Sequence, residues 1–219
     1  MAAIARDQQE IPLPRELIDR IELVTDHACG WNENGTNRKP PMCNLYRMTK
    51  AQAEIARLFN AGAASGANFA DEVYPGYNGA VIVDGQLRSM VWGFPLSQKS
   101  KRTGEPLKPR PVNNARSDKL DSFMWRYSFT ERRCLIPVTA WAEAEGRAGR
   151  KTRTWMSVAS AETFAVGGIW QNSDEWGACY SMVMCDAAGP AAEVHDRMPV
   201  ILRPEQHDQW LTGSSAEAR

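Results

Sequence analysis

The sequence predicts an α+β domain organised around an antiparallel sheet. Two observations carry this prediction: most apolar runs have the length of strands and are separated by turn residues, and a few runs with helical spacing are interspersed among them. The chain has 219 residues, which fits one domain, and we find no internal repeat. No apolar run is long enough to span a membrane, and the N-terminus lacks the pattern of a secretory signal.

The first 41 residues differ in character from the rest. Apolar residues at helical spacing predict a short amphipathic helix over Pro14 to Val24. Gly30 to Pro41 is rich in Asn, Gly and Pro, which predicts a connector. We therefore divide the chain into an N-terminal extension, residues 1–41, and a domain, residues 42–219. The extension is either a leader that the mature protein lacks, an appendage, or translated sequence upstream of the true start.

A helix and a hairpin are predicted in the first part of the domain. Thr49 to Gln52 has the spacing of a capping box, and the apolar residues after it predict a helix that stops at Gly62. Val81 to Val83, the turn residues Asp84 and Gly85, and the alternating run that ends at Trp92 predict a β-hairpin.

In the second part of the domain, the sequence predicts a loop, two helices and three strands. Ser97 to Pro111 is basic and contains prolines, so we expect a loop. A helix capped by Ser117 or Asp118 is expected next, because four apolar residues recur at i, i+3, i+4 and i+7: Leu120, Phe123, Met124 and Tyr127. The remaining segments are strands at Cys134 to Ala144, Thr163 to Trp170 and Ala178 to Cys185, and a final helix that starts near Pro204.

Cysteine usage and charge narrow the functional class. The five cysteines, an odd number without C-x-x-C pairs, indicate reduced thiols in a cytoplasmic protein, and their spacing matches no common zinc site, so we expect no metal. The net charge is zero, yet Lys99 to Arg133 holds ten Lys/Arg against four Asp/Glu. From Ala161 onward the counts are three and nine. A chain polarised in this way can present one positive face, although ordinary solvated surface is the simpler interpretation.

The candidate nucleophile is Cys43, which follows Met42. A protein that begins at this cysteine carries an amine and a thiol on adjacent carbons. The amine can form an imine with an aldehyde, and the thiolate can then close on the imine carbon. A lone cysteine is more often a buried core residue, and that interpretation stays open at this point.

Four polar residues in apolar surroundings support a site, and each has a structural alternative. Asn114 either caps a helix or positions a nucleophile, and the planar fork of Arg116 suits a phosphate. Glu143 lies in an apolar strand on the same predicted face as Trp141, so it either pairs with a buried arginine or acts as a general acid or base. His195 stands beside Asp196 and Arg197, which makes it an acid–base candidate rather than only a structural histidine.

Six segments in order resemble the signature of the SRAP family, the SOS-response-associated peptidases or abasic-site processing proteins. They are Met42-Cys43-Asn44-Leu45-Tyr46, Trp92-Gly93-Phe94, Asn114-Ala115-Arg116, Arg133 to Glu143, Phe164 to Trp170 and His195 to Pro199. The resemblance runs from Met42 to about Leu211 and implies a mixed, β-rich fold with a barrel-like core that binds single-stranded DNA in a positive cleft. It also implies that an N-terminal cysteine forms a thiazolidine with the ring-opened aldehyde of an abasic site.

The resemblance assigns catalytic roles to Cys43, Asn114, Glu143 and His195. The Cys43 amine would attack the aldehyde, Glu143 would relay protons, Asn114 would orient the cysteine, and His195 would protonate the departing ring oxygen or hold the opened sugar. Such chemistry needs no cofactor.

DNA contacts are expected from five further residues. Arg116 and the basic loop with Lys108 and Arg110 would bind phosphates, and Trp92 would stack beside the missing base unless it is a core residue of the hairpin. The family often has a basic residue two positions after the cysteine, where this chain has Leu45, so Arg47 is expected to take over that contact. The chain also ends soon after the final helix, where relatives usually continue.

Three functions remain open on the sequence alone. The first is a DNA-damage protein that crosslinks abasic sites in single-stranded DNA, working as a cytoplasmic monomer with no membrane partner. The second is a cysteine peptidase that cleaves the Met42–Cys43 bond, so that residues 1–41 are its propeptide, or cleaves other peptides. The third is a single-strand DNA binder whose Cys43 stays blocked by the extension.

Overall fold

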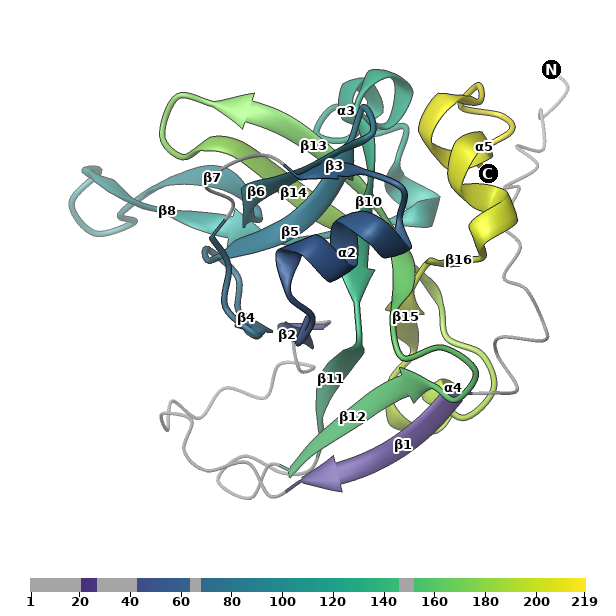
Figure 1. The fold of residues 1–219 in the computed structure, drawn as a ribbon. Coiled ribbons are helices and arrows are strands. Elements are labelled where there is room, and N and C mark those ends of the chain that lie inside the picture. Colours follow the sequence, from purple (N-terminus) through teal and green to yellow (C-terminus); the bar gives the residue numbers. More distant parts are fainter. Residues whose placement is uncertain (1–20, 27–42, 64–67, 146–151) are drawn as a thin grey trace, which may run out of the picture.

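The computed structural model describes residues 21–26, 43–63, 68–145 and 152–219, and in these ranges the protein is mostly antiparallel β-sheet with a few short helices (Figure 1). This confirms the predicted α+β class. The described strands are β1 (Ile21–Asp26), β2 (Leu45–Arg47), β3 (Gly62–Ala63), β4 (Glu72–Val73), β5 (Asn78–Val83), β6 (Gln86–Trp92), β7 (Phe94–Lys99), β8 (Pro106–Val112), β9 (Asn114–Arg116), β10 (Arg133–Val138), β11 (Ala140–Glu145), β12 (Thr152–Val158), β13 (Phe164–Ser173), β14 (Gly177–Asp186), β15 (Arg197–Pro199) and β16 (Ile201–Leu202).

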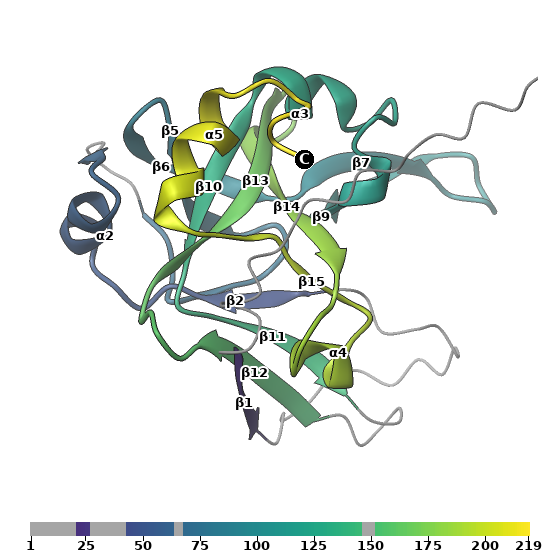
Figure 2. The same cartoon turned by 90° about the vertical axis from the view of Figure 1, so that its right-hand side faces the viewer.

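The described helices are short and lie at the periphery of the strands (Figures 1 and 2). They are α2 (Gln52–Leu58), α3 (Arg126–Glu131), α4 (Ala191–Val194) and α5 (His207–Thr212), with 3₁₀ turns at Ser117–Lys119 and Pro204–Gln206. None of the helices in the described ranges is long and apolar enough to cross a membrane.

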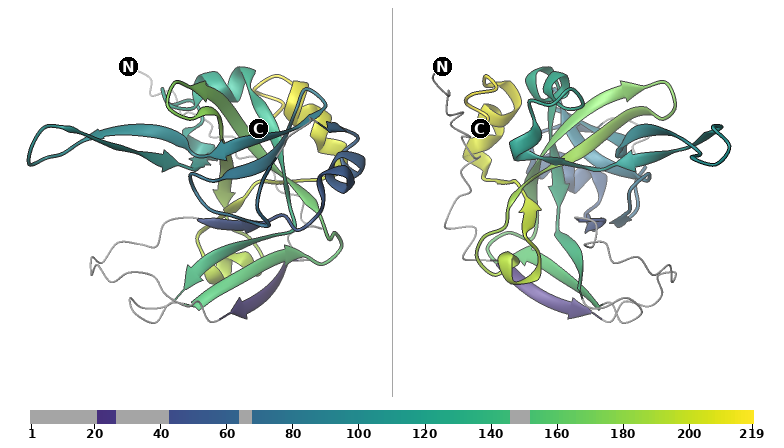
Figure 3. Two further views of the ribbon diagram at one scale, coloured as in Figure 1. Left: turned by 60° about the vertical axis from the view of Figure 1, so that its left-hand side comes forward. Right: turned by 180° about the vertical axis from the view of Figure 1, so that it is seen from behind.

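Five strands close into a barrel-like ring. The strands β14, β13, β10, β5 and β6 pair antiparallel in that order, and β6 closes the ring by pairing in parallel with β14 through Val91–Cys179 and Trp92–Tyr180. A second sheet has the order β1-β12-β11-β2-β4, and β7 and β8 form a separate two-stranded hairpin that projects from the body (Figure 3). The fold therefore has three parts: a packed ring, a flanking sheet and an exposed hairpin.

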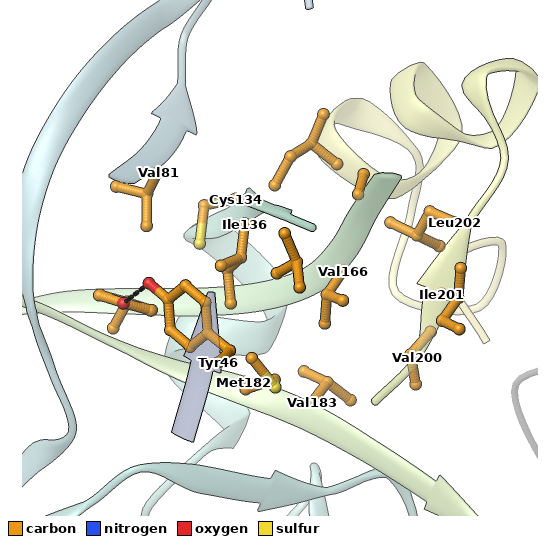
Figure 4. Packing of buried hydrophobic residues seen from close by; sticks show 14 of the residues in the cluster. Tyr46, Val81, Cys134, Ile136, Val166, Met182, Val183, Val200, Ile201 and Leu202 are labelled. Carbon is orange, nitrogen blue, oxygen red and sulfur yellow. Dashed lines mark hydrogen bonds between the residues drawn. The ribbon is translucent and has the colours of Figure 1, made fainter. Parts of the chain in front are cut away.

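The core fills the interior of the ring and the space between it and the second sheet. Figure 4 shows part of it, with Tyr46 of β2 beside Ile136 of β10 and Met182 of β14. The buried hydroxyls of Tyr46 and Tyr180 share a hydrogen bond. Gly79 makes room for this pair, since a Cβ at that position would lie 2.0 Å from the Tyr46 hydroxyl. This close approach requires glycine.

The predicted strand from Cys134 to Ala144 is two strands that belong to different sheets. The break is at Thr139, whose N–H donates to the Arg47 carbonyl at 2.8 Å and whose hydroxyl donates to the same oxygen at 3.1 Å. The expected alternation survives in β11, since Trp141 and Glu143 are both buried while Ala142 packs in a separate small cluster with Leu45 and Trp155. The bend carries the chain from the ring to the second sheet and sets Glu143 beside β2.

Three predictions for single segments are wrong in the described residues, and two of them concern segments that are strands. The helix over Pro14 to Val24 is contradicted by β1, in which Ile21 to Asp26 pair antiparallel with β12, while residues 14–20 and the expected connector lie outside the described ranges. The predicted loop Ser97 to Pro111 is the hairpin β7–β8. Its prolines are tolerated because both strands of a two-stranded arm are edges, where a missing N–H need not break a ladder.

The helix predicted around Leu120 to Tyr127 is also wrong. The chain there makes a 3₁₀ turn and further turns before α3 begins at Arg126. The apolar stripe does not face the core, since Phe123 is 88% exposed and Tyr127 is 59% exposed, while Leu120 is fully buried. Helical spacing over eight residues is therefore coincidental here. By contrast, the hairpin around Asp84 and the helix before Gly62 are confirmed as β5–β6 and α2, although no side-chain cap bond forms at the start of α2.

The C-terminal helix is fastened to the ring by one buried cation. Arg133 donates from its guanidinium to the carbonyls of Trp210, Phe129 and Gly213. Trp210 in turn donates from its indole to the Cys134 carbonyl at 2.9 Å. Among the described residues Arg133 is the one buried arginine, and it pairs with backbone oxygens. Arg133 is therefore not the partner of Glu143, and the alternative in which Glu143 pairs with a buried arginine is not supported.

Candidate functional site

Cys43 lies at the junction of the second sheet and the ring, two residues before the start of β2. It is fully buried, and its thiol donates to the Leu45 carbonyl at 3.5 Å. Burial, and then the neighbouring Glu143 carboxylate, raise the pKa of the Cys43 thiol well above its usual value. The thiol is therefore protonated at neutral pH, and a nearby base is needed before it can act as a nucleophile.

Glu143 is the group closest to the Cys43 nitrogen. The Cys43 N–H donates to Glu143 Oε1 at 2.9 Å, and only 2% of Glu143 is exposed. The pKa of Glu143 is raised to about 8, above all by burial; the bond from the Cys43 N–H opposes this rise, and the negative charge of Asp196 adds to it. A carboxyl with a pKa near neutrality can both accept and return a proton.

Two asparagines fix the Cys43 carbonyl. The side-chain amides of Asn113 and Asn114 each donate to the Cys43 oxygen at 2.9 Å. Asn114 is held in β9, which pairs in parallel with β14, while Asn113 comes directly before it. Sequence reasoning named Asn114 and missed Asn113. The repeated asparagine was the available signal, and only the fold reveals that both side chains converge on one carbonyl.

His195 follows α4 and precedes β15, which pairs with β14 at Asp186–Arg197. The Arg197 N–H donates to His195 Nδ1 at 3.0 Å, and the Arg197 carbonyl oxygen lies 3.3 Å from the same nitrogen. Asp196 Oδ1 lies 3.2 Å from the same Nδ1. This segment approaches the centre, since Asp196 acts on Glu143 electrostatically and on Arg116 as well.

Arg116 is the last residue of β9, and its guanidinium is paired with Asp118. Its Nε donates to Asp118 Oδ1 at 2.8 Å and its Nη2 donates to Asp118 Oδ2 at 2.7 Å. The bonds to Asp118 raise the pKa of Arg116 and lower that of Asp118. The side chain is still 42% exposed, so a phosphate that approaches Arg116 competes with Asp118 for the fork.

The residues expected to contact DNA lie in different parts of the fold. Lys108 and Arg110 are exposed on β8 of the projecting hairpin (Figure 3). Arg47 instead lies on the outer face of the second sheet, where its guanidinium stacks 3.7 Å from the centre of the Trp155 ring and donates to Glu72 at 2.7 and 3.0 Å. The fold thus separates Arg47 from the hairpin cations that were expected to share its role.

Trp92 does not offer a free ring. It is fully buried, and its indole N–H donates to the Asn113 carbonyl at 3.0 Å. Its edge packs against Tyr46, with ring centres 5.0 Å apart. This geometry favours the alternative role of Trp92 as a core tryptophan. Its hydrogen bond also holds Asn113, the residue before Asn114.

The centre is thus a buried cysteine with a carboxyl on its nitrogen, two amides on its carbonyl and a histidine segment nearby. Within the described ranges, no three His, Cys, Asp or Glu side chains gather in a way that could hold a metal ion. The arrangement points to a class of β-rich proteins built around a cysteine whose backbone nitrogen and carbonyl are both hydrogen-bonded to polar side chains.

Comparisons with known proteins identify that class. The sequence model of the SOS response associated peptidase (SRAP) family matches residues 42–219, and the chain belongs to this family. The abasic site processing proteins YoqW and YobE of Bacillus subtilis (strain 168) are each 28% identical to it over 164 residues, which is 67% of this chain and 70% or 72% of theirs.

Solved structures show the same fold. A crystal structure of a protein from Bordetella bronchiseptica, 25% identical, superposes with a TM-score of 0.66 over 81% of this chain and 92% of that one. A protein from Bacteroides thetaiotaomicron, 20% identical, superposes with a TM-score of 0.64 over 80% of this chain and 84% of that one. The predicted family and its barrel-like, β-rich fold are confirmed.

Proposed function

We propose that this protein, in the form that begins at Cys43, captures abasic sites in single-stranded DNA as a covalent thiazolidine and so serves in the response to DNA damage. One observation carries the proposal: Glu143 Oε1 lies 2.9 Å from the Cys43 nitrogen. In a chain that begins at Cys43 this nitrogen is the amine. The names of the Bacillus relatives, abasic site processing proteins, give the substrate class.

The chemistry proceeds by two bond-forming steps. The Cys43 amine adds to the C1′ aldehyde, and the carbinolamine loses water to give an imine. The thiol then adds to the imine carbon, so that amine, thiol and aldehyde together give one thiazolidine and one water. Glu143 accepts a proton from the amine and returns it to the departing hydroxyl, which its raised pKa permits.

The asparagines and the histidine segment have supporting roles in this proposal. Asn113 and Asn114 hold the Cys43 carbonyl, so that the nitrogen and the sulfur of the same residue keep their orientation. His195 would protonate the departing ring oxygen of the sugar or hold the opened sugar. Arg116 and the exposed cations of β8 would hold phosphates on either side of the lesion.

The peptidase alternative has less support. Cleavage of the Met42–Cys43 bond passes through an oxyanion on the carbonyl of residue 42, and donors aimed at that oxygen would stabilise it. The amides of Asn113 and Asn114 instead bind the carbonyl of Cys43, one peptide unit further along. The raised pKa of the thiol also opposes the ready thiolate that a cysteine peptidase uses.

A denaturing gel tests the proposal. Protein that begins at Cys43 is incubated with a single-stranded oligonucleotide that carries one abasic site, and in parallel with the tetrahydrofuran analogue, which has no aldehyde. We expect a slowly migrating adduct with the first oligonucleotide and none with the second. If neither oligonucleotide gives an adduct while a peptide substrate is hydrolysed, the peptidase function becomes the better supported one.

A further inference from the structure

The strand β1 belongs to the N-terminal extension, outside the residues 42–219 that match the family. It pairs antiparallel with β12 without a break in register, from Ile21–Val158 to Asp26–Arg153. This makes β1 the outermost strand of the second sheet, as Figures 1 and 2 show. The extension therefore contributes a strand to the folded protein, and none of the roles proposed above uses that strand.

Without β1, the edge of the second sheet would be β12. An edge strand presents unpaired N–H and C=O groups, and proteins protect such edges with charges, prolines, bulges, short strands or a covering segment. β12 has seven residues, of which one is charged, Arg153, and none is proline. The opposite edge of the sheet, β4, is only two residues long and is followed closely by Pro75. The β12 edge is thus the one that needs a covering strand, and β1 supplies it.

Ile21 anchors β1 in the main core. It is 5% exposed and belongs to the same buried cluster as Val158, the residue opposite it. Glu22, the next residue of the strand, is exposed. A row of backbone pairs together with a buried side chain is what an extended peptide uses when it adds to the edge of a sheet. By these features β1 has the form of a ligand of β12.

The contacts of β1 do not require its covalent link to the Cys43 centre. The strand ends at Asp26, and residues 27–42, which the structure does not describe, lead from it to Cys43. A cut anywhere in that segment breaks none of the pairs between β1 and β12. The proposed active form begins at Cys43, so an extension removed from it would be a separate piece that still carries this strand.

The edge also adjoins the strand that carries Glu143. Thr154 of β12 is opposite Glu143 of β11 on one side and opposite Thr25 of β1 on the other. Thr154 is buried, at 1% exposure. A strand bound to β12 therefore supports the sheet that holds Glu143 beside Cys43.

We propose that the outer edge of β12 is a peptide-binding site whose ligand is residues 21–26 of the extension, both within the full chain and after the extension has been cut off. Removal of the extension then gives a complex of two chains. Within one chain the connection gives the strand a high effective concentration, whereas a separate piece binds according to its own affinity. The proposal does not depend on the capture of abasic sites.

Hydrogen exchange of the β12 amides tests the proposal in the full chain, with a recognition sequence for a site-specific protease inserted between residues 32 and 33. The uncut protein is compared with cut protein from which the extension has been removed by dilution and gel filtration. We expect slow exchange in the first and fast exchange in the second. A synthetic peptide of residues 17–28 should restore slow exchange. An extension that stays bound through gel filtration supports the proposal equally.

Peptide variants test the anchor. The peptide with Ile21→Ala should bind about 30-fold more weakly or worse, because a buried isoleucine is lost. The peptide with Glu22→Ala is the matched control and should bind like the parent peptide, because Glu22 is exposed. In the full chain, the double variant Leu23→Pro/Val24→Pro should speed exchange in β12. Neighbouring N–H groups of a strand point to opposite sides, so the two prolines remove a donor that faces β12.

Three results would overturn the proposal. The first is equal exchange of β12 in the uncut protein and in the protein freed of its extension. The second is failure of the peptide to restore slow exchange in freed protein that stays folded, including freed protein that elutes as a dimer, since a second copy would then be the occupant. The third applies if the freed protein unfolds: unchanged β12 exchange in the full-chain double proline variant. Adduct formation with abasic DNA is measured separately, so these results leave the proposed function untouched.

Discussion

The Cys43 centre and the β7–β8 hairpin are opposites in their physical environment. Cys43 and Glu143 are buried, at 0% and 2% exposure, and burial raises the pKa of both groups. The hairpin projects into solvent and carries exposed cations such as Lys108 and Arg110 (Figure 3). The proposed chemistry depends on removal of water, whereas the proposed binding of the DNA strand depends on charges that stay hydrated.

This difference predicts that the two regions fail in different ways. Changes at the centre should alter the rate of covalent capture and leave DNA affinity nearly intact, because phosphate contacts supply most of the nonspecific affinity. Changes at the cationic residues should alter affinity and its dependence on salt, and leave the intrinsic rate at saturating DNA unchanged. Three experiments test this division, and a fourth tests the raised pKa of Glu143.

The largest effect is expected for Cys43→Ala in protein that begins at residue 43. The variant keeps an amine but lacks the thiol, so no thiazolidine can form and no stable adduct should appear on a denaturing gel. Borohydride should still trap the imine made by the amine. Cys185→Ala removes a thiol that contacts the Met198 and Pro199 carbonyls and should leave capture unchanged. A stable adduct with Cys43→Ala in the absence of reductant would show that another residue reacts.

Glu143→Gln should slow capture without abolishing it. The amide can still accept a hydrogen bond from the Cys43 nitrogen but cannot relay a proton, and general acid–base catalysis typically contributes about 10²–10⁴-fold. The measurement is the single-turnover rate at saturating DNA. Glu72→Gln is the control, because Glu72 pairs with Arg47 on the outer face of the second sheet. An unchanged rate for Glu143→Gln would remove the carboxyl from the mechanism.

Glu143 should also make stability depend on pH in the full chain. In the folded protein its carboxyl has a pKa of about 8 and is protonated below that pH, whereas its ordinary pKa is 4.5. Between these values the folded state binds one more proton, so the free energy of unfolding should fall as pH rises, by up to about 1.4 kcal/mol per pH unit. Above the upper value the slope should vanish. Urea unfolding at several pH values measures this, and Glu143→Gln should lose the slope. Parallel curves for both proteins would contradict the raised pKa.

The smallest effect is expected for Arg116→Ala. It should weaken binding similarly for all sequences and reduce the slope of log affinity against log salt by about 0.7, the value for one phosphate contact on a single strand. Arg57→Ala, on the exposed side of α2, should leave the slope unchanged. Fluorescence anisotropy over a salt series measures both variants. Identical slopes for Arg116→Ala and the parent would mean that Asp118 keeps the fork occupied when DNA binds.

Local patterns with a clear physical cause were readable from the sequence. The turn at Asp84 and Gly85 predicted the β5–β6 hairpin, and the period of two in β11 placed Glu143 on the same face as Trp141, where the structure shows both to be buried. Such patterns depend on neighbours along the chain, and so they carry over directly into local structure.

The failures arose where distant parts of the chain decide. Ile21 to Asp26 has apolar residues that fit a helix as well as a strand, and the open edge of β12 selects the strand. Trp92 could not be placed from its own segment, because its burial depends on Tyr46 and on the Asn113 carbonyl. Asn113 acquired its contact with Cys43 across 70 residues of chain, a distance that no local pattern encodes.

The central claim is that the Cys43 nitrogen reacts as a free amine, and one comparison tests it most directly. The full 219-residue chain, verified by intact mass, and protein that begins at Cys43 are each incubated with abasic single-stranded DNA under the same conditions. In the full chain this nitrogen is part of a peptide bond. We expect the protein that begins at Cys43 to form the stable adduct and the intact full chain to form none. An adduct of equal yield on the intact full chain would contradict the claim.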